Sequence, residues 1–411
     1  MISVPISNAL LPIPDMTRTR LLDISRLVSR AGLTPTGVDR VELAYVDAFL
    51  ADTQTPVYGL ARTALGLALL DRKGLTAFAT ACRTGSFDLP DILSRLNGNL
   101  TPAARRGQSF VRWRAVDRCR PHRLGRMLDR LGSGLSYYNV GHSNLTAQLL
   151  RTLSNHDGSR VTVLIHDTIP LDHPDMQRPK SVPRFRKMLT AALNHADQLI
   201  CTTQAAANDL RRHAGPRAGQ LDVVVAPLGV TPPSPAPEEI PYRLSPVRPY
   251  FMVVGTIEPR KNHALLLDIW QDWGPGAPDL LICGRRGWLN EDVFRRLDEG
   301  VPHVKEAQDL SDGAIAALLA GSLGLLFPSF AEGYGLPPIE AAALGVPVIC
   351  ADLAACREAM GDWPVYLNPS DRYEWSIEIR TLLDHAPARR TSRRDAPSWK
   401  QHFDTVLTSA P

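Results

Sequence analysis

The sequence predicts an α/β protein with two domains joined by a linker. Short continuous apolar runs, such as residues 323–327, alternate with stretches of helical periodicity, which is the pattern of parallel strands connected by helices. A chain of 411 residues is long enough for two separate cores. Residues 227–249 contain eight prolines, too many for a helix or a central strand, so we expect a semi-rigid linker there. The first domain is then residues 1–226, the second is residues 250–393, and a last helix lies within residues 394–411.

The first domain is expected to begin with a strand at residues 20–28 and a helix at residues 38–52, whose apolar residues share one face. Two further helical patterns lie near residues 74–83 and 183–195. The remaining apolar runs predict buried strands. In chain order these runs are PVYGLA, LGLALLD, SYYNV, VTVLIH, QLICT and DVVVAP.

The second domain is expected to begin with the strand YFMVVG and the loop TIEPRKN, after which Asn262 can cap the helix HALLLDIW. The strands LLICG, LGLLF and VPVICA follow, and a helix at residues 352–360 precedes the last strand, VYLNPSD. The sequence SWKQHFDTVL predicts the final helix.

Bulk composition excludes several protein classes. Apolar residues make up 44% of the chain and charged residues 21%, as in ordinary soluble proteins. No run of eighteen apolar residues occurs, and the first twenty residues lack the charged-then-apolar order of a signal peptide. The six cysteines form no CxxC pair, so neither a zinc site nor a disulfide framework is expected. We therefore expect a cytoplasmic protein.

Positive charge is concentrated in residues 101–130, within the least regular part of the first domain. Nine arginines stand there against two aspartates, a local net charge of +7 in a chain whose total is +4. Phe110 and Trp113 interleave with the arginines, which is typical of an interfacial segment on an anionic membrane, so a position at the inner membrane is expected. A solvated helix face is the simpler alternative. Nucleic-acid binding is a third, but no recognisable module supports it.

Residues 328–351, PSFAEGYGLPPIEAAALGVPVICA, carry the strongest signal for a ligand site. They predict a loop after a buried strand, then a helix with two prolines in its first turn, then another strand. In an open α/β sheet such a corner lies at the carboxyl edge, where ligands bind and free N–H groups favour an anion. Glu332 and Glu340 are eight residues apart and can face one crevice. Glu340 alone could simply stabilise the helix end, whereas Glu332 has no obvious structural task.

This stretch closely resembles the E-x7-E signature of the retaining glycosyltransferases of the GT-B fold usually grouped as family 4. The resemblance implies two Rossmann-like domains whose parallel sheets face an interdomain cleft, with the last helix crossing back to the first domain. It further implies that Glu332 contacts hydroxyls of the donor sugar, that the helix N-terminus holds the diphosphate, and that Glu340 takes the ribose hydroxyls. The donor-binding residues at this corner would be Gly333, Tyr334, Gly335, Leu336 and Glu340.

The sequence HDTIPLDHPD follows a predicted strand and is a second candidate site. A histidine on an apolar face is usually a core residue, but His166 ends a strand and polar residues follow it. Similar family members show HD-x-IP-x-x-HP, with a histidine near the transferred sugar. The resemblance assigns that position to His166, with Asp167 beside it and His142 as the substitute.

Two further loops are expected at the donor diphosphate. Gly37 immediately precedes a predicted helix, where a glycine lets a phosphate approach the backbone; it also resembles the first loop of these transferases, although it could be a turn residue only. Arg260 and Lys261 are adjacent cations at a strand-to-helix corner, and related sequences carry a similar EPRKN element whose lysine and arginine contact the diphosphate. Gly37, Gly255, Arg260 and Lys261 are the donor-binding residues expected at these loops. Thr256 follows Gly255 where many members have another arginine.

The loop GRRGW is the expected neighbour of the nucleotide base, through Arg285 and Trp288. The predicted reaction is retaining transfer of a hexose from a nucleoside diphosphate sugar, with GDP-mannose as the favoured donor, to a saccharide or polyprenyl-diphosphate-linked acceptor in surface polysaccharide synthesis. No D-x-D sequence occurs, so we expect no metal and no cofactor beyond the donor. The alternatives are a sugar-nucleotide 2-epimerase, a glycoside phosphorylase, or a non-catalytic sugar-nucleotide or membrane module.

Overall fold

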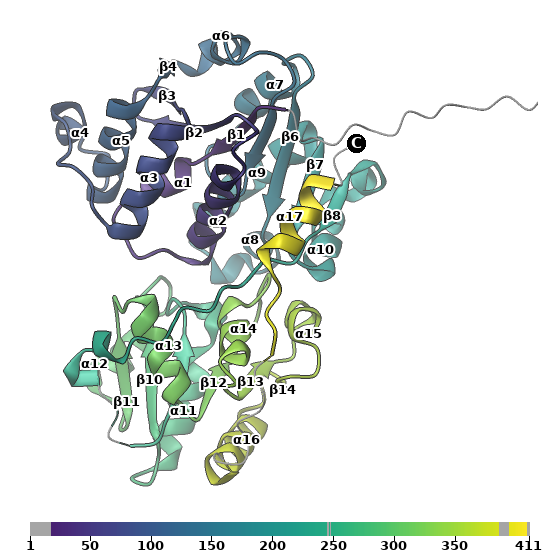
Figure 1. Cartoon of the computed structure of the whole chain (residues 1–411). Helices are drawn as coiled ribbons and strands as arrows, with labels where there is room; N and C mark the ends of the chain where they lie inside the picture. The colour runs from purple at the N-terminus through teal and green to yellow at the C-terminus, as the bar shows by residue number, and fades with distance from the viewer. Residues whose placement is uncertain (1–17, 245, 247, 386–393, 409–411) are drawn as a thin grey trace, which may run out of the picture.

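Two sheets organise the chain, one in each half (Figure 1). The computed structural model describes residues 18–244, 246, 248–385 and 394–408. Within these ranges the first sheet has eight strands in the order β4-β3-β2-β1-β5-β6-β7-β8, and the second has six in the order β11-β10-β9-β12-β13-β14. The first contains β1 (Arg20–Asp23), β2 (Val57–Thr63), β3 (Gly66–Leu70), β4 (Asp117–Cys119), β5 (Ser136–Asn139), β6 (Arg160–Ile165), β7 (Gln198–Cys201) and β8 (Val223–Val225). The second contains β9 (Tyr250–Val254), β10 (Asp279–Cys283), β11 (Val304–Ala307), β12 (Gly324–Phe327), β13 (Val348–Ala351) and β14 (Val365–Leu367).

Helices connect the strands, and together with the mainly parallel pairing they confirm the expected α/β class. The first half contains α1 (Ser25–Ser29), α2 (Gly37–Ala51), α3 (Arg72–Thr84), α4 (Ile92–Leu96), α5 (Pro102–Arg114), α6 (Leu124–Asp129), α7 (Ala147–Ser154), α8 (Ile169–Asp172), α9 (Ser181–His195) and α10 (Gln204–Ala214). The second half contains α11 (His263–Trp273), α12 (Glu291–Glu299), α13 (Asp312–Gly321), α14 (Leu336–Ala343), α15 (Ala354–Met360), α16 (Arg372–His385) and α17 (Trp399–Thr408).

The strand predicted at residues 20–28 is too long, because the chain leaves the sheet after Asp23. The Asp23 carboxylate accepts a hydrogen bond from the Ser25 N–H at 2.9 Å, and α1 begins there. Ile24 and Leu27 are both buried, and their separation of three residues is the period of a helix. An apolar run read as one strand is therefore a strand followed by a helical turn.

One edge of the first sheet is antiparallel. β3 pairs antiparallel with both β2 and β4. Residues 64–65 are the whole connection between β2 and β3, which is too short for the crossover that a parallel pair requires. Gly66 has a φ of 128°, and a Cβ there would lie 2.3 Å from the Cys119 carbonyl oxygen, so this turn requires glycine. β2 and β3 thus form a hairpin, and β4, which pairs with β3 on its other side, is the edge strand.

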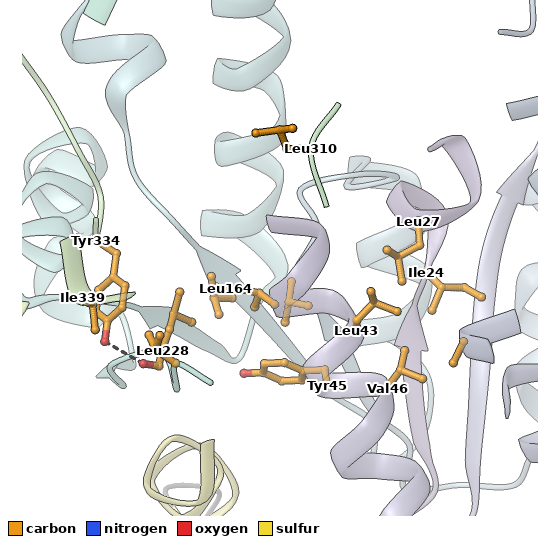
Figure 2. Close-up of a cluster of buried hydrophobic side chains, with 14 of the residues drawn as sticks. Ile24, Leu27, Leu43, Tyr45, Val46, Leu164, Leu228, Leu310, Tyr334 and Ile339 are labelled. Carbon is orange, nitrogen blue, oxygen red and sulfur yellow. Dashed lines mark hydrogen bonds between the residues drawn. The ribbon is translucent and has the colours of Figure 1, made fainter. Parts of the chain in front are cut away.

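Apolar packing continues from the first domain into the second (Figure 2). Tyr45 and Leu164 belong to the same buried cluster as Tyr334 and Ile339 of the second domain. The Tyr334 hydroxyl donates a hydrogen bond to the Leu228 carbonyl oxygen at 2.8 Å, which ties this loop to the start of the linker beside that cluster. The loop that carries the E-x7-E sequence therefore packs against the first domain.

The last helix, α17, lies against the first domain (Figure 1). Its His402 is buried, with Nε2 2.7 Å from the Tyr45 hydroxyl, and the Phe403 ring packs 4.9 Å from the Tyr45 ring. A Cβ on Gly229 would lie 2.3 Å from the Trp399 backbone nitrogen. A glycine at that position therefore lets α17 approach the linker closely.

Residues 101–130 are more regular than expected, since they form α5, β4 and α6. Phe110 is buried, and its ring lies 5.8 Å from that of Phe78. Arg112 is also buried and pairs with Asp91 at 2.6 Å. These two side chains belong to the core and cannot contact a membrane. In the described part of the chain, no helix combines the length and the apolar character needed to cross a bilayer.

Candidate active site

One interdomain cleft of about 780 Å³ is lined by every site residue expected from the sequence. Both domains contribute to its walls, and the residues come from the loops that follow the carboxyl ends of the strands. The expected residues that line it are Gly37, His142, His166, Asp167, Gly255, Arg260, Lys261, Arg285, Trp288, Glu332, Gly333, Tyr334, Gly335, Leu336 and Glu340. This is the edge at which parallel α/β sheets bind ligands.

The second-domain wall holds two cations against one carboxylate. Arg260 and Lys261 come from the short 3-10 helix after β9, and Glu332 comes from the loop after β12. Arg260 Nη1 and Lys261 Nζ lie 2.8 and 2.5 Å from the same oxygen, Glu332 Oε1. Glu258 Oε1 lies 2.7 Å from Arg260 Nε and fixes the guanidinium from the other side. The four side chains form one network of charge-assisted contacts.

Burial and charge act in opposite directions on the pKa values of this network. Burial alone would raise the pKa of Glu332, but Arg260 and Lys261 lower it to about 2. Burial lowers the pKa of Lys261, and its contact with Glu332 partly opposes this shift. Burial raises the pKa of Glu258. Glu332 is therefore ionised at neutral pH and can accept hydrogen bonds from hydroxyl groups.

Asn262 turns the chain behind the two cations, but not by the expected cap. Its φ is 54°, in the left-handed region, and its side-chain Nδ2 donates to the Pro369 carbonyl oxygen at 2.8 Å. The side chain makes no capping hydrogen bond to α11, so that prediction is wrong. The left-handed backbone makes the corner between Lys261 and the helix.

Two glycines fit the loop before α14 into the domain interface. A Cβ on Gly333 would lie 2.4 Å from the His166 carbonyl oxygen, so only glycine permits this approach. The hydroxyls of Thr202 and Thr203 donate to the Gly333 carbonyl oxygen at 3.1 and 3.3 Å. Gly335 has a φ of 93° and directly precedes α14. The N-terminus of α14 thereby opens into the cleft. Pro337 and Pro338 have no N–H, so the N–H groups that favour an anion there are those of the residues beside the two prolines.

The first-domain wall carries two neutral histidines. His166 Nε2 lies 2.7 Å from the Val140 carbonyl oxygen, and His142 Nε2 lies 2.9 Å from the Leu164 carbonyl oxygen. Burial lowers the pKa of His166 to about 3 and that of His142 to about 4. Since a carbonyl oxygen can only accept, the proton of the neutral His166 ring is on Nε2 and its Nδ1 is left as an acceptor. His142 Nε2 also lies 3.3 Å from the His166 backbone N–H.

The N-terminus of α2 faces that of α14 across the cleft. A Cβ on Gly37 would lie 3.1 Å from the Leu336 side chain, so the two loops approach closely at this point. Asp39, buried in the first turn of α2, pairs at 2.7 Å with Arg26 and also at 2.7 Å with Arg30. These two arginines line the cleft and share this one carboxylate.

Arg40 is the clearest site residue that sequence reasoning missed. Its Nη2 reaches across the cleft to Glu340 Oε1 at 2.6 Å. Burial raises the pKa of Glu340, and Arg40 opposes that shift. Only the position of Arg40 in the first turn of the helix after Gly37 could have indicated it. Glu258 was also missed, although it belongs to the quoted loop TIEPRKN.

Arg285 and Trp288 lie at the rim of the cleft. Arg285 pairs with Asp309 at 2.5 Å, and the Trp288 indole N–H donates to the Met176 carbonyl oxygen at 3.0 Å. Arg178 lies over the Trp288 ring, 5.0 Å from its centroid. Arg285 is thus held within the second domain, whereas Trp288 is held in place by the first domain.

Residues 248–385 match the family model described as glycosyl transferases group 1. The match extends over the second domain from β9 to α16. Residues 140–215 match a second model, the N-terminal domain of glucosyltransferase 3-like proteins. The two matches cover the two walls that meet at Gly333 and His166.

Two characterised relatives are mannosyltransferases of Escherichia coli. The serotype-specific mannosyltransferase WbdA is 30% identical over 276 residues, which are 62% of this chain and 34% of WbdA. The O-antigen chain mannosyltransferase B is 27% identical over 265 residues, which are 60% of this chain and 68% of that protein. This chain thus spans about a third of the length of WbdA.

Solved structures share the whole fold. Anabaena HepE in complex with UDP-glucose superposes with a TM-score of 0.58 at 15% identity, covering 95% of this chain and 94% of that chain. The sucrose-phosphate synthase of Thermosynechococcus elongatus gives a TM-score of 0.59 at 15% identity, with 91% and 92% covered. The chain therefore has the GT-B fold expected from the sequence.

Proposed function

We propose that this protein is a retaining, metal-independent hexosyltransferase, with GDP-mannose as its donor and a saccharide or polyprenyl-diphosphate-linked saccharide as its acceptor. One observation carries the proposal: Glu332 contacts both Arg260 and Lys261 beside the free N-terminus of α14. The mannosyltransferases among the relatives support the choice of sugar. Their O-antigen role supports an acceptor in surface polysaccharide synthesis.

Donor binding exchanges the partner of the two cations. The diphosphate carries more charge than a carboxylate and approaches the N–H groups of α14, so it takes over Arg260 and Lys261. Glu332 is then released to accept hydrogen bonds from the sugar hydroxyls. Glu340 binds the ribose hydroxyls, which requires Arg40 to leave it.

The transferred sugar is activated by stabilising its leaving group. As the bond from C1 to the diphosphate breaks, charge grows on the diphosphate, and Arg260, Lys261 and the α14 N–H groups are already in place to stabilise it. The acceptor hydroxyl attacks from the face that the diphosphate leaves, and its proton passes to the departing diphosphate oxygen. The configuration at C1 is kept without an enzyme nucleophile. His166 Nδ1 accepts a hydrogen bond from the sugar and orients it.

Glu332 is not the nucleophile of a double displacement of the kind that retaining glycosidases use. Its carboxylate is held by two cations, which weakens it as a nucleophile. A glycosyl adduct trapped on the wild-type protein, but absent from Glu332→Gln, would contradict this part of the proposal.

Among the described residues, no group of three His, Cys, Asp or Glu side chains is arranged to hold a metal ion. In the proposed mechanism, Arg260 and Lys261 take the role of a metal, because they contact the carboxylate that the diphosphate displaces. Loss of activity in EDTA that Mg²⁺ or Mn²⁺ restores would contradict it.

A panel of GDP-, UDP- and dTDP-sugars tests the proposal, with nucleotide release and thermal shift as readouts. We expect GDP-mannose to give the largest shift and to release GDP only when an acceptor saccharide is present. Isomerised donor without acceptor would instead assign an epimerase, and release that requires inorganic phosphate would assign a phosphorylase. Binding without any turnover would leave a sugar-nucleotide binding module.

A further inference from the structure

Exposed apolar side chains gather on one edge of the first domain. Among the described residues, twelve large apolar side chains are exposed, and seven of them lie between residues 65 and 116 with exposed fractions from 56% to 81%. These seven are Leu65, Leu89, Ile92, Leu93, Leu96, Trp113 and Val116. Single exposed apolar residues are normal, but a concentration of this kind marks a contact surface.

The segments that carry these side chains are neighbours. α4 packs on α5, and α5 packs on β3. The Val116 N–H donates to the Leu69 carbonyl oxygen at 2.9 Å where β4 begins. In Figure 1, α4 and α5 lie at the left end of the first domain, β3 and β4 at its upper left and α6 at its top, all away from α17. We call residues 65, 89–96 and 113–130 the β4 edge.

Arginines line a hollow of about 700 Å³ on the β4 edge. The residues that line it are Leu65, Arg118, Cys119, Arg120, Arg123, Arg126 and Arg130. Arg130 pairs with Asp117. Within the described residues, the other four arginines are in no ion pair. Guanidinium groups facing one hollow repel one another, and their planar donors match the oxygens of a phosphate.

Nearby carboxylates do not neutralise this charge. Asp91 is held by buried Arg112 at 2.6 Å, and Asp88 lies 3.3 Å from Arg114. The β4 edge therefore combines unpaired cations with apolar side chains that point into solvent. Leu65 belongs to both groups, since it is exposed and lines the arginine hollow.

We propose that the β4 edge docks this protein on a bilayer of anionic phospholipid. Its leucines, isoleucine and tryptophan insert among the acyl chains, and the arginine hollow binds the phosphates of the headgroups. A nucleic acid would use the cations but would leave the apolar side chains in water. The docking surface differs from the one expected from the sequence, because Phe110 and Arg112 are buried and residues 89–96 replace them.

Membrane docking does not depend on the chemistry of the cleft, so an experiment can contradict the docking proposal without contradicting the proposed function. The test is co-sedimentation of the whole chain with vesicles of equal parts phosphatidylcholine and phosphatidylglycerol, compared with pure phosphatidylcholine. We expect binding to the anionic vesicles, and at least about tenfold weaker binding to the neutral ones, since each arginine near an anionic surface contributes about 1 kcal/mol.

Two double variants separate the apolar part from the charged part. Leu93→Glu with Leu96→Glu and, separately, Arg120→Glu with Arg123→Glu each reduce binding to anionic vesicles at least about tenfold. The matched controls are Ile377→Glu on α16 and Arg243→Glu in the linker, which leave binding unchanged. Thermal unfolding and the GDP-mannose thermal shift, both expected to be unchanged in all four variants, show that fold and donor site are intact.

Several outcomes would overturn the docking proposal. These are equal binding to neutral and anionic vesicles, no binding to either kind of vesicle, or a loss of vesicle binding in the control variants as large as in the double variants. Binding of an oligonucleotide that the arginine variant loses, while vesicles are not bound, would reassign the surface to nucleic acid.

Discussion

The two walls of the cleft differ in how they handle charge. On the second-domain wall, Arg260 and Lys261 share one carboxylate, Glu332, which a stronger anion can displace. On the first-domain wall the two histidines are neutral, and Asp39 holds Arg26 and Arg30 from within its own domain. The first arrangement suits a diphosphate, and the second suits uncharged sugar and acceptor hydroxyls. In the proposed mechanism, the second domain stabilises the leaving group and the first domain positions the sugar.

The largest expected effect comes from removing a cation of the second-domain wall. Arg260→Ala should lower kcat by about 10²–10³-fold, the usual cost of losing one preorganised charge-stabilising donor. Steady-state kinetics with GDP-mannose measure it. The matched control is Arg286→Ala, because Arg286 pairs with Asp298 and Glu306 outside the cleft lining. An equal loss in both variants would contradict the assignment.

A smaller loss is expected on the first-domain wall. His166→Ala should lower kcat about tenfold, the value of one hydrogen bond in the transition state, with little change in donor Kd. His385→Ala, an exposed histidine on α16, is the control and should have no effect. A large rise in donor Kd without a change in kcat would show that His166 binds the diphosphate rather than the sugar.

The two walls should also respond differently to pH. His166 and His142 have pKa values lowered below the ordinary 6.5, so the unfolded chain takes up their protons first and the free energy of unfolding falls as the pH drops below 6.5. Each contributes at most about 1.4 kcal/mol per pH unit. The pKa of Glu332 is lowered from 4.5, so its contribution is complete above 4.5 and is lost only below it.

Urea unfolding at several pH values between 7.5 and 4 measures these contributions. His142→Gln with His166→Gln should reduce the pH dependence between 6.5 and 5. The part that remains is expected from His263 and His402, whose pKa values burial also lowers. A slope unchanged in that variant would show that other groups cause it.

The smallest expected effect concerns the contact between the walls. Arg40→Ala frees Glu340 and should lower donor Kd by about threefold. This is less than the tenfold change in Kd that corresponds to about 1.4 kcal/mol of binding free energy. Calorimetric titration with GDP-mannose measures it, with Arg151→Ala on the exposed surface of α7 as control. A rise in Kd would show instead that Arg40 itself binds the donor.

The sequence predicts more of the second-domain wall than of the first-domain wall. The strand, loop and helix around Glu332 and Glu340 are local, so spacing and glycine positions predict them. His166 needed the family resemblance, because its orientation depends on the distant Val140 carbonyl. Arg40 was missed because its partner lies 300 residues away in the other domain. The residues next to Arg40 in the sequence do not indicate an ion pair across the cleft.

The same reason explains the errors in secondary structure and surface. The run at residues 20–28 was read as one strand because burial from several sides removes the alternation that distinguishes strand from helix. Phe110 was expected at a membrane because it lies among arginines, whereas Phe78 and Phe87 cover it. Composition reports which residues are present, and tertiary packing decides which of them reach the surface.

The most direct test is calorimetric binding of GDP-mannose to the wild type, to Arg260→Ala with Lys261→Ala, and to Arg286→Ala. The account predicts that the double variant loses at least about a hundredfold in affinity, since two charge-assisted contacts to the diphosphate are removed, and that Arg286→Ala binds as the wild type does. Equal affinity in all three proteins would contradict the claim that the cleft between Glu332 and the first domain holds the donor diphosphate.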